Sequence, residues 1–518
     1  MSAAVQEKSF RYAFKTQPWK HQFEAFDIAV RRPASMLAFR MRLGKSKTAI
    51  DLINAWDADP VLVFGPISAT KVWPSQFAEH SLADYDVCLL NSGSVAKRAE
   101  QAQFALDVAR AKGRRVAIVV NGDAVWRSEF GRLVKKVRWG AIVGDEIHRA
   151  KSPKGKLSKF LSEIPRRGEY RLGLTGTPMP HSPLDLWAQF RFLDESVFGR
   201  NFSTFKVRYV AQLIEIIPAG PVIIVNCPRK WDGFFKGVPG AVFGADIGAW
   251  RFPNTRYVMQ RLHTIRSGIP AAHIVTGYRN QEELNANFYK LAIRVLEKDA
   301  FDVPEEMLVD RECDLSPRER RVYDGLEDDF YARVGAGEIT ASNALTQLLR
   351  LQQATSGYAK LDDGSQVGIG TSKADLLADV LEDLEPPVVV FCRFIHDLDA
   401  VRGVAEKLGL VYHELSGRRK DLTEDAKMLP ETQVLGCQIQ AGGVGVDLSR
   451  ASTDIDYSIG FNYGDWDQAH ARIKKPHDRL HKTTTVFLRA ANTLDSKLYK
   501  AIQAKKDLIE VCLKRSED

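Results

Sequence analysis

Short apolar runs alternate with longer helical stretches through about the first 190 residues of the chain. The runs are rich in Val, Ile, Leu and Phe, which is typical of strands buried on both faces. The stretches between them repeat apolar residues every three or four positions, which indicates amphipathic helices. This alternation predicts a parallel sheet covered by helices. The predicted strands are Met36–Phe39, Val61–Phe64, Val87–Leu90, Val116–Val120, Trp139–Val143 and Tyr170–Leu174.

The same alternation returns in the last third of the chain. It predicts a second parallel sheet, so the expected fold class is α/β with two tandem parallel-sheet domains. Two such domains make the cleft between them the expected ligand site. The predicted strands are Val388–Phe391, Val411–Leu415, Thr432–Cys437, Asp454–Ile459 and Thr485–Leu488, with a helix at Leu398–Leu408.

From about residue 194 to residue 278 the alternation is lost, and aromatic and basic residues crowd together. Basic residues among aromatic ones are compatible with a nucleic-acid track. The alternative, which we favour, is a small satellite core with a solvated rim. A helix is expected next, over Asn280–Lys298. The crowded residues include Trp231, Phe234, Phe235, Lys236, Phe243, Trp250, Arg251, Phe252, Arg256, Tyr257, Arg261 and Arg266.

These patterns predict two domains. The first spans 1–312 and contains the insertion at about 194–278. The second spans 313–518 and begins with a helical block at 315–357. The acidic stretch 302–314, which contains a proline, is the expected linker between the two domains.

The composition is that of an ordinary globular protein. The chain has 518 residues, 45% of them hydrophobic and 27% charged, and no stretch approaches a membrane span. Six scattered cysteines without a CxxC pair argue for a reducing, cytoplasmic setting (nuclear if the source is eukaryotic) and against a zinc site. The net charge of +8 favours a polyanionic partner or simply supports solubility. We expect a monomer.

The stretch Met36–Ile50 combines a strand, a short loop and the start of a helix. Its loop ends in Gly44-Lys45-Ser46, and the backbone N–H groups of such a loop can hold phosphates. Lys45 would reach the β- and γ-phosphates of a nucleotide, and the Ser46 hydroxyl would bind Mg²⁺. Phe39 stands where the full P-loop pattern has its outer glycine. On this stretch alone, an ordinary strand–helix turn remains an alternative.

Two carboxylates follow the predicted strand Trp139–Val143, about 100 residues after Lys45. Asp145 is placed to hold Mg²⁺, and Glu146 is placed to orient and deprotonate an attacking water. His148 would couple this site to the next segment. The alternative to an active-site motif is a solvated turn at the end of the strand. The P-loop pattern upstream argues against that alternative.

Asp145-Glu146-Ile147-His148 resembles the DExH box of superfamily 2 helicases and translocases, and Met41–Ser46 resembles the first motif of that family. The chain is most similar to the Swi/Snf class. The resemblance extends from about Pro18 to the C-terminus and rests on the order and spacing of its motifs. The other similar stretches are Pro18–Gln22 (the adenine-reading segment), Leu174–Leu193 (which begins with the TGTP linker motif), Gly277–Leu284, Leu315–Tyr323, Val388–Phe394 (motif IV), Ala441–Ala451 (motif V) and Gln468–Lys475 (motif VI).

The resemblance implies two RecA-like lobes that share ATP and Mg²⁺ between them, with an arginine from the second lobe acting on the γ-phosphoryl group. The expected catalytic residues are Lys45, Asp145, Glu146, Arg472 and Lys475. The expected nucleotide-binding residues are Gln22, Arg42, Leu43, Gly44, Lys45, Ser46, Lys47, Gly445 and Asp447. Ser46 and Asp145 would hold the metal. Ser68, Lys71, His148, Thr175, Thr177, Gly442 and Gly443 would contact nucleic acid or couple hydrolysis to domain movement.

Three positions depart from the family pattern. Arg42 replaces a glycine of the first motif, and Asp447 replaces the common asparagine of motif V. Lys475 stands at the second arginine of motif VI, the usual arginine finger, and lysine lacks the planar fork that pairs two phosphate oxygens. We expect hydrolysis to be slowed unless Arg472 or Arg479 takes that role.

Three functions are compatible with these residues. The first is a DNA-stimulated ATPase that translocates on double-stranded DNA and remodels or displaces bound material. The second is a strand-separating DNA or RNA helicase of the same superfamily, for which single-stranded DNA or RNA would be the partner. The third is an ATP-dependent clamp that does not hydrolyse ATP, an idea motivated by Arg42 and Lys475. We rank them in this order. Trp73 and Trp187 have apolar neighbours at helical spacing and are expected in the core.

Overall fold

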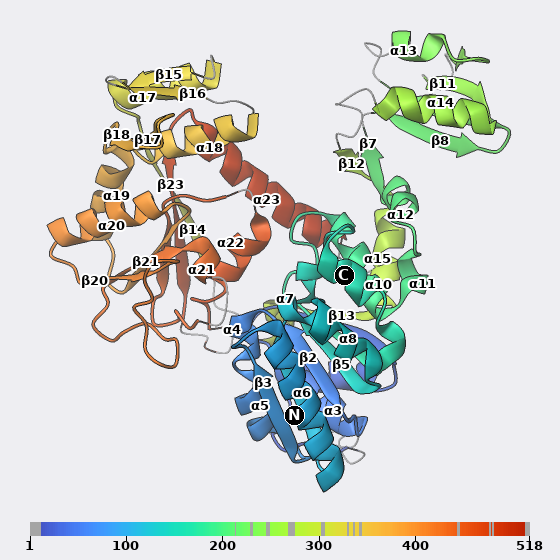
Figure 1. Cartoon of the computed structure of the whole chain (residues 1–518). Helices are drawn as coiled ribbons and strands as arrows, with labels where there is room; N and C mark the ends of the chain where they lie inside the picture. Colours follow the sequence, from blue (N-terminus) through green and yellow to red (C-terminus); the bar gives the residue numbers. More distant parts are fainter. Residues whose placement is uncertain are drawn as a thin grey trace. The chain divides into compact units, whose positions relative to one another are not determined.

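The computed structural model describes residues 12–212, 214–227, 232–244, 249–267, 275–301, 306–328, 331–334, 337–340, 344–442, 446–460, 462–475, 478 and 481–512. The chain divides into two compact units (Figure 1). The larger unit contains Met1–Glu195 and Leu291–Val511, and the smaller unit contains Ser196–Lys290 and Cys512–Asp518. Each is described by itself below.

The larger unit contains a seven-stranded sheet whose neighbouring strands are all parallel. Its order is β13-β1-β6-β5-β2-β4-β3. All residues of β1 and β2 are buried, as the unbroken apolar runs predict. The strands are β1 (Ala34–Phe39), β2 (Val61–Gly65), β3 (Tyr85–Leu90), β4 (Arg115–Asn121), β5 (Trp139–Asp145), β6 (Gly168–Leu174) and β13 (Ala292–Val295).

Helices connect and cover the strands of this first sheet. Their ends follow local chemistry: the Ser94 side chain accepts the Lys97 N–H at the start of α6, and Gly113, at φ 61°, ends that helix in a left-handed conformation. The helices are α2 (Lys20–Ala29), α3 (Lys45–Ala55), α4 (Ile67–Thr70), α5 (Trp73–His80), α6 (Val95–Lys112), α7 (Gly122–Val125), α8 (Ser128–Lys136), α9 (Lys156–Leu161), α10 (Leu186–Leu193) and α16 (Glu297–Ala300). The short helix α11 (Glu195–Phe198) begins at the last residue of the segment Met1–Glu195, and its other residues belong to the smaller unit.

The larger unit also contains a second parallel sheet of six strands, ordered β14-β23-β22-β19-β21-β20. Two parallel sheets within one chain confirm the predicted fold class of two α/β domains. The strands are β14 (Glu306–Cys313), β19 (Val388–Cys392), β20 (Tyr412–Leu415), β21 (Val434–Gln438), β22 (Thr453–Asp456) and β23 (Thr483–Ala490).

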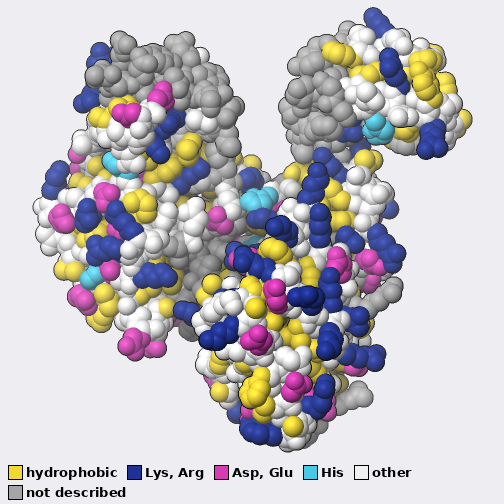
Figure 2. Space-filling view, viewed as in Figure 1, with side chains coloured by type: hydrophobic (Ala, Val, Ile, Leu, Met, Phe, Trp, Pro, Cys, Tyr) yellow, Lys and Arg dark blue, Asp and Glu magenta, His cyan; other side chains and the backbone are white. Residues whose placement is uncertain are grey.

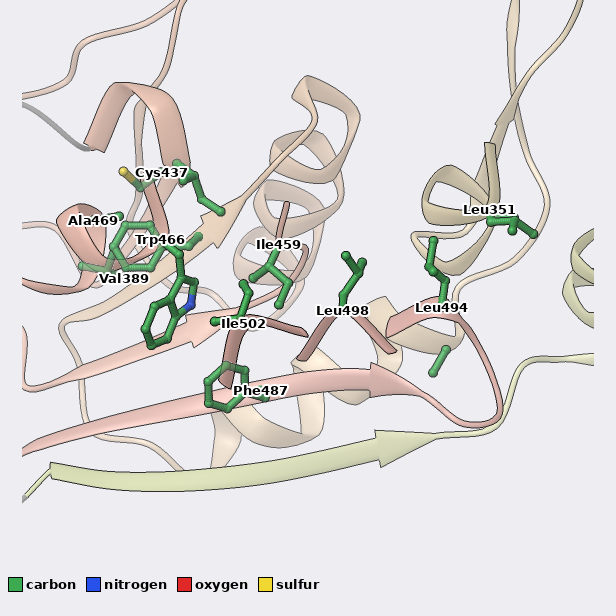
Figure 3. Packing of buried hydrophobic residues seen from close by; sticks show 14 of the residues in the cluster. Leu351, Val389, Cys437, Ile459, Trp466, Ala469, Phe487, Leu494, Leu498 and Ile502 are labelled. Carbon is green, nitrogen blue, oxygen red and sulfur yellow. The ribbon is translucent and has the colours of Figure 1, made fainter. Parts of the chain in front are cut away.

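One face of the second sheet packs against the C-terminal helix and against the helix that carries motif VI. Trp466, Phe487 and Leu498 lie in this core (Figure 3). The elements around the sheet are α17 (Pro317–Asp328), β15 (Tyr331–Val334), β16 (Gly337–Thr340), α18 (Ala344–Thr355), β17 (Tyr358–Lys360), β18 (Gln366–Gly368), α19 (Ser372–Glu382), α20 (Ile395–Lys407), α21 (Ile439–Gly442), α22 (Tyr463–His470) and α23 (Leu494–Cys512). None of the helices in the described part of the chain is long and apolar enough to cross a membrane.

Three sequence-based predictions about connecting segments need correction. The expected linker 302–314 contains strand β14, which pairs along its whole length with β23 at the edge of the second sheet. The helix expected over 280–298 ends at Tyr289, because Ala292–Val295 forms edge strand β13 beside β1. The helical block at 315–357 is interrupted by the β15–β16 hairpin.

The smaller unit has its own core, which confirms the favoured interpretation of the insertion as a satellite core. An antiparallel sheet, ordered β10-β11-β9-β8, packs with α13 and α14 around Phe235, Trp250 and Leu262. The elements are α12 (Phe202–Tyr209), β7 (Val210–Gln212), β8 (Glu215–Ala219), β9 (Val222–Asn226), α13 (Asp232–Lys236), β10 (Val242–Gly244), β11 (Ala249–Pro253), α14 (Arg256–Ser267), β12 (Val275–Tyr278) and α15 (Gln281–Tyr289).

A buried cluster of charged groups joins α22 to the second sheet. His470 Nε2 lies 2.9 Å from an Asp454 carboxylate oxygen and 3.3 Å from an Asp456 carboxylate oxygen. Its Nδ1 atom donates to the Trp466 carbonyl at 2.7 Å, so both ring nitrogens have partners when the ring is protonated. Burial opposes the charged ring, but Asp456 and Asp454 raise the pKa of His470 well above its usual value. The imidazolium therefore neutralises carboxylates that have no access to water.

We predict that His470→Ala lowers the free energy of unfolding by about 3–5 kcal/mol, because it leaves two buried carboxylates without their cation. Since the folded-state pKa of His470 is raised, its stabilisation is full below the unfolded-state pKa of about 6.5 and declines as pH rises through the folded-state pKa. Denaturant unfolding of the full chain between pH 6 and pH 9 measures both effects.

The matched control is His413→Ala, because the His413 ring lies at the border of the second sheet, 4.0 Å from the exposed carboxylate of Glu431. We expect that change to cost far less. Equal destabilisation by the two substitutions, or stability of the wild-type chain that does not fall above pH 6.5, would contradict the assignment.

Candidate active site

The loop between β1 and α3 is shaped to present backbone N–H groups. Gly44 has φ 76° and precedes the first residue of α3, Lys45. A side chain at this position would collide with Gln22, because a Cβ atom on Gly44 would lie 2.1 Å from Gln22 Nε2. Gln22 itself donates to the Leu43 carbonyl at 3.2 Å. Glycine is therefore required both for the left-handed conformation and for the close approach of Gln22.

Lys45 is half-buried at the start of α3 and forms no ion pair within the described part of the chain. Its Nζ atom donates to the Phe39 carbonyl at 3.1 Å and to the Arg40 carbonyl at 3.4 Å. Burial lowers the pKa of Lys45, and this effect outweighs the attraction of Glu146 and Asp145. A half-buried ammonium that has only neutral oxygen partners favours the approach of an anion.

Asp145 ends β5 and is held by two donors. Trp73 Nε1 donates to Asp145 Oδ2 at 3.0 Å, and the Glu146 N–H donates to Asp145 Oδ1 at 3.0 Å. Burial, assisted by the neighbouring charge of Glu146, raises the pKa of Asp145 to about 6. This carboxylate is therefore short of positive charge, which a bound divalent cation would supply.

Glu146 is half-buried, whereas Asp145 is buried, and it has the opposite electrostatic balance. Burial acts against its charge, but His148, Lys45 and Arg472 together lower the pKa of Glu146 to about 2. Its backbone is left-handed, at φ 50°. Its Oε2 atom is buried, and His148 Nδ1 lies 3.2 Å away from it. Glu146 is thus an ionised carboxylate beside His148.

His148 connects Glu146 to two other motifs. Its Nδ1 atom lies 3.0 Å from the Thr175 hydroxyl, and that hydroxyl accepts the Thr177 N–H at 3.1 Å. Its Nε2 atom lies 3.3 Å from Gln468 Nε2, on the helix beside the second sheet. The link therefore extends from the carboxylate pair to motif VI.

Arg472 follows α22 and brings a second half-buried cation to the site. Burial lowers the pKa of Arg472 to about 10, against the attraction of Glu146. Arg472 in turn lowers the pKa of both Lys45 and Glu146, so the three side chains lie within electrostatic range. The structure brings together residues from both sheets that are more than 300 positions apart in the sequence.

Arg42 makes three contacts with the second sheet domain. Its Nη2 atom donates to Asp447 Oδ1 at 2.6 Å and to the Arg472 carbonyl at 2.8 Å, and its Nη1 atom donates to the Lys474 carbonyl at 2.6 Å. Arg42 has φ 62°, a strained conformation for a residue with a side chain. Two of the three departures from the family pattern, Arg42 and Asp447, therefore contact each other.

A second arginine of the same loop makes a parallel connection. Arg40 forms a bidentate ion pair with Asp467 of α22, in which its Nη2 atom donates to Oδ1 at 2.6 Å. Burial opposes the charge of Arg40, but Asp467 and Tyr463 raise its pKa. The loop before Lys45 thus holds α22 through Arg40, and the segments on either side of that helix through Arg42.

Asp447 is fixed independently of Arg42. Its carboxylate accepts the Ser449 N–H and hydroxyl, and its N–H donates to the Ala426 carbonyl at 3.0 Å. Burial opposes ionisation, but Ser449 and Arg42 lower the pKa of Asp447 to about 2.

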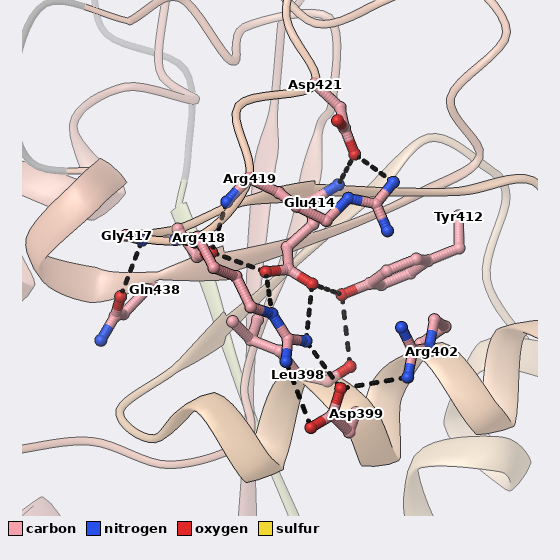
Figure 4. A network of polar contacts seen from close by, with 11 residues as sticks. Leu398, Asp399, Arg402, Tyr412, Glu414, Gly417, Arg418, Arg419, Asp421 and Gln438 are labelled. Carbon is pink, nitrogen blue, oxygen red and sulfur yellow. Dashed lines mark hydrogen bonds and ion pairs between the residues drawn. The ribbon is translucent and has the colours of Figure 1, made fainter.

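The loop that carries Ala426 is tied to β20 by a network of charged side chains (Figure 4). Arg418 donates from Nε and Nη2 to the buried carboxylate of Glu414, at 2.8 Å and 2.9 Å, and from Nη2 to Asp399 at 2.6 Å. Glu414 in turn accepts the Ser416 hydroxyl at 2.6 Å. This network fixes the start of the loop, and the Ala426 carbonyl further along the same loop accepts the Asp447 N–H.

For the other predicted site residues, the structure shows burial or contacts that do not define a role in the site. Ser46 is half-buried in the first turn of α3, whereas the Lys47 side chain is buried and pairs with Asp51 at 2.5 Å. Lys71 is exposed. The Lys475 side chain is half-buried, and within the described residues it makes no hydrogen bond or ion pair. Gly443, Gly445 and the side chain of Ser68 lie outside the described residues, and Gly442 ends α21. The roles expected of these residues stay predictions.

Sequence reasoning missed three contributors. Trp73 is fully buried, as expected for a core residue, but its indole N–H also orients Asp145. Arg40 directly precedes the stretch that resembles the first motif, and Gln468 lies in the motif VI stretch, yet their contacts with Asp467 and His148 depend on segments that are distant in sequence. The one signal for Arg40 in the sequence is its position, because it is a charged residue between the apolar run that ends at Phe39 and the glycine of the loop.

A cavity of about 260 Å³ opens beside the two carboxylates. It lies at the carboxyl ends of β2, β4 and β5, where parallel sheets commonly hold ligands. Its lining includes Asn121, Asp123, Asp145, Glu146 and Arg149 but no residue of the Gly44–Lys45 loop. The cavity therefore approaches the carboxylates from a side that the loop does not line.

Several known proteins are similar to this chain. The sequence model of the SNF2-related domain family matches residues 21–357. A Caenorhabditis elegans homolog of the SWI/SNF-related matrix-associated actin-dependent regulator of chromatin subfamily A-like protein 1 is 23% identical over 94% of this chain and 61% of its own length. The Saccharomyces cerevisiae transcription regulatory protein SNF2 is 22% identical over 82% of this chain and 23% of its own length.

Two further matches concern a short relative and a solved structure. The putative protein p41 of Acyrthosiphon pisum secondary endosymbiont phage 1 is 23% identical over 69% of this chain and 68% of its own length. The Sulfolobus solfataricus SWI2/SNF2 ATPase core in complex with dsDNA is 19% identical, with a TM-score of 0.39, and covers 96% of this chain. The family match confirms the Swi/Snf resemblance and the prediction of an ATP hydrolase.

We predict that Arg42 and Asp447 act as one unit in catalysis, because they contact each other across the site and both adjoin Arg472. Arg42→Ala and Asp447→Ala should each lower kcat/KM for ATP by about tenfold, and the double variant should be no worse than either single one. That result corresponds to a coupling energy of about 1.4 kcal/mol, within the range for residues in direct contact.

The control cycle uses Arg31 and Asp27, which form an exposed pair of 2.7 Å at the C-terminal end of α2. Removing either partner there should leave kcat/KM unchanged. If the Arg42 and Asp447 effects instead multiply in the double variant, the two residues act separately and the unit does not exist.

Proposed function

Because the chain belongs to the SNF2-related domain family, we propose that it is a DNA-dependent ATPase motor that translocates on double-stranded DNA and displaces or remodels material bound there. The chain spans 61% of the length of its C. elegans relative and less than a quarter of the yeast one, so the activities of those whole proteins do not transfer directly.

One observation carries the proposal: the carboxylate pair of the first sheet lies in electrostatic and hydrogen-bonding range of motif VI beside the second sheet. Arg472 acts on the charge of Glu146, and Gln468 contacts the His148 ring that also touches Glu146. A change in charge or position at the carboxylates therefore alters contacts with residues beside both sheets. Such a link is what a motor needs in order to convert hydrolysis into relative movement of its domains.

The residues present fit a triphosphate with a divalent cation. Lys45 is a half-buried cation with only carbonyl partners, Asp145 is short of positive charge, and Glu146 is ionised beside His148. ATP supplies the phosphoanhydride bond, and Mg²⁺ neutralises charge on its phosphates. Ser46 and Asp145 would hold the metal ion, and Lys45 with the N–H groups at the start of α3 would hold the phosphates.

Two residues then carry the chemistry. Glu146, ionised at neutral pH, orients the attacking water and accepts its proton. Arg472 stabilises the charge that develops on the transferred phosphoryl group. Asp145 and Glu146 are adjacent carboxylates, and the separation of their pKa values, about 6 and about 2, assigns them different roles.

Two observations support double-stranded DNA as the partner. The chain carries a net charge of +8, which suits a polyanion. One relative, the chromodomain-helicase-DNA-binding protein 8 of Xenopus tropicalis, is named for DNA binding. Binding through the phosphate backbone would let the motor move along any sequence.

Displacement of a third DNA strand tests the proposal. A motor that moves along an intact duplex removes a triplex-forming strand in its path, whereas a helicase unwinds a forked duplex. We expect ATP-dependent triplex displacement, no unwinding of forked DNA or RNA, and ATP hydrolysis that double-stranded DNA stimulates more than RNA does. Glu146→Gln is the control, because it should retain ATP and DNA binding while losing displacement. Unwinding of the fork without triplex displacement would make the chain a strand-separating helicase.

A further inference from the structure

The smaller unit carries a surface whose chemistry none of the preceding roles uses. On α14, the side chains of Val258 and Leu262 are buried in the core of this unit. The opposite side of the helix faces solvent and has no acidic residue. We call it the α14 face, and its residues are Arg256, Tyr257, Gln260, Arg261, His263 and Thr264.

The cations of the α14 face are available for a ligand. Arg256 and Arg261 make no hydrogen bond or ion pair with any described residue, and the same is true of Lys236 at the end of α13. Some exposed arginines elsewhere in the chain do pair with carboxylates, as Arg31 does with Asp27 and Arg114 with Asp86. In Figure 2, the described surface of the lobe that carries α14 and β11 shows basic, histidine and hydrophobic side chains and no acidic ones on the side that faces the viewer.

Apolar exposure accompanies the positive charge. The Tyr257 side chain is 63% exposed, and Phe234 and Phe243 of the same unit are also exposed. The core of this unit is formed by other residues, such as Phe235, Trp250 and Leu262. The exposed rings therefore contribute little to the stability of the unit. Exposed aromatic residues next to unpaired cations are typical of surfaces that hold nucleic acids.

We propose that the α14 face is a second DNA-binding surface, which holds the phosphate backbone of a duplex. Arg, Tyr, Gln and Thr, the residue types exposed on it, are those that donate hydrogen bonds to phosphate oxygens without reading sequence. Such a surface would keep the motor on DNA between cycles of hydrolysis. The proposal rests on the proposed function only in its choice of duplex DNA as the ligand.

The test compares two triple variants of the full chain. The first is Arg256→Ala, Tyr257→Ala and Arg261→Ala. The second is Phe104→Ala, Arg110→Ala and Lys112→Ala on α6, where Phe104 is 71% exposed but Asp107 and Glu100 lie among the cations. Each triple removes two positive charges and one exposed ring. Only the first removes them from a face without acids.

The measurement is the dissociation constant for a 30-base-pair duplex, by fluorescence anisotropy, across a range of salt concentrations. For the α14 triple we expect binding about tenfold weaker and a salt slope smaller by about 1.8, since each lost phosphate contact removes about 0.9. The α6 triple should match the wild type. The conservative variant Arg256→Lys, Tyr257→Phe, Arg261→Lys should keep most of the salt slope, which separates loss of charge from misfolding of the unit.

The outcomes separate this inference from the proposed function. A wild-type chain that neither binds duplex DNA nor is stimulated by it would overturn the proposed function. A wild-type chain that binds duplex DNA, together with an α14 triple that binds equally tightly and with the same salt slope, would overturn the α14 face alone. If both triple variants bound the duplex equally weakly, the α14 face would also be overturned. The loss of affinity would then follow from the lower net charge of the chain and not from the position of the residues.

Discussion

The structure depends on two adjacent carboxylates, Asp145 and Glu146, which are largely withdrawn from water at the end of a central parallel strand. Two negative charges in contact and largely out of water are unfavourable unless cations lie close by. Lys45 comes from the loop after β1, and Arg472 from the segment after α22. Neither sheet alone supplies both cations. The electrostatics of one carboxylate pair thus requires residues from both halves of the larger unit.

The connections around this pair are specific to the chain. Arg42 occupies a glycine position of the family pattern at the cost of a left-handed backbone, and it meets Asp447, which occupies an asparagine position. Arg40 adds a bidentate contact to Asp467 of α22. These two arginines hold the segments on both sides of Arg472, so they position it without touching the reacting groups. Lys475, at the finger position, has no such support within the described residues.

Much of this arrangement could be predicted from the sequence. Unbroken apolar runs identified the strands of both sheets, because a central parallel strand is buried on both faces. The edge strands β13 and β14 were not predicted, because β14 is largely exposed and β13 has only four residues. The P-loop, the carboxylates and motif VI were recognisable because each is a short run of residues in a characteristic order. The Arg42–Asp447 contact was not, because it joins residues 405 positions apart and each looked like an isolated departure. The bond from Trp73 to Asp145 was hidden for the same reason.

The central claim is that residues from both sheets act on one triphosphate, with Arg472 as the cation that crosses to it. The most direct measurement is kcat for ATP, at saturating ATP and duplex DNA, in Arg472→Ala and Lys475→Ala, with ATP affinity measured separately. The account predicts a loss of at least about 10²-fold for Arg472→Ala with ATP binding largely retained, and a change of no more than a few-fold for Lys475→Ala. A wild-type rate in Arg472→Ala would contradict it.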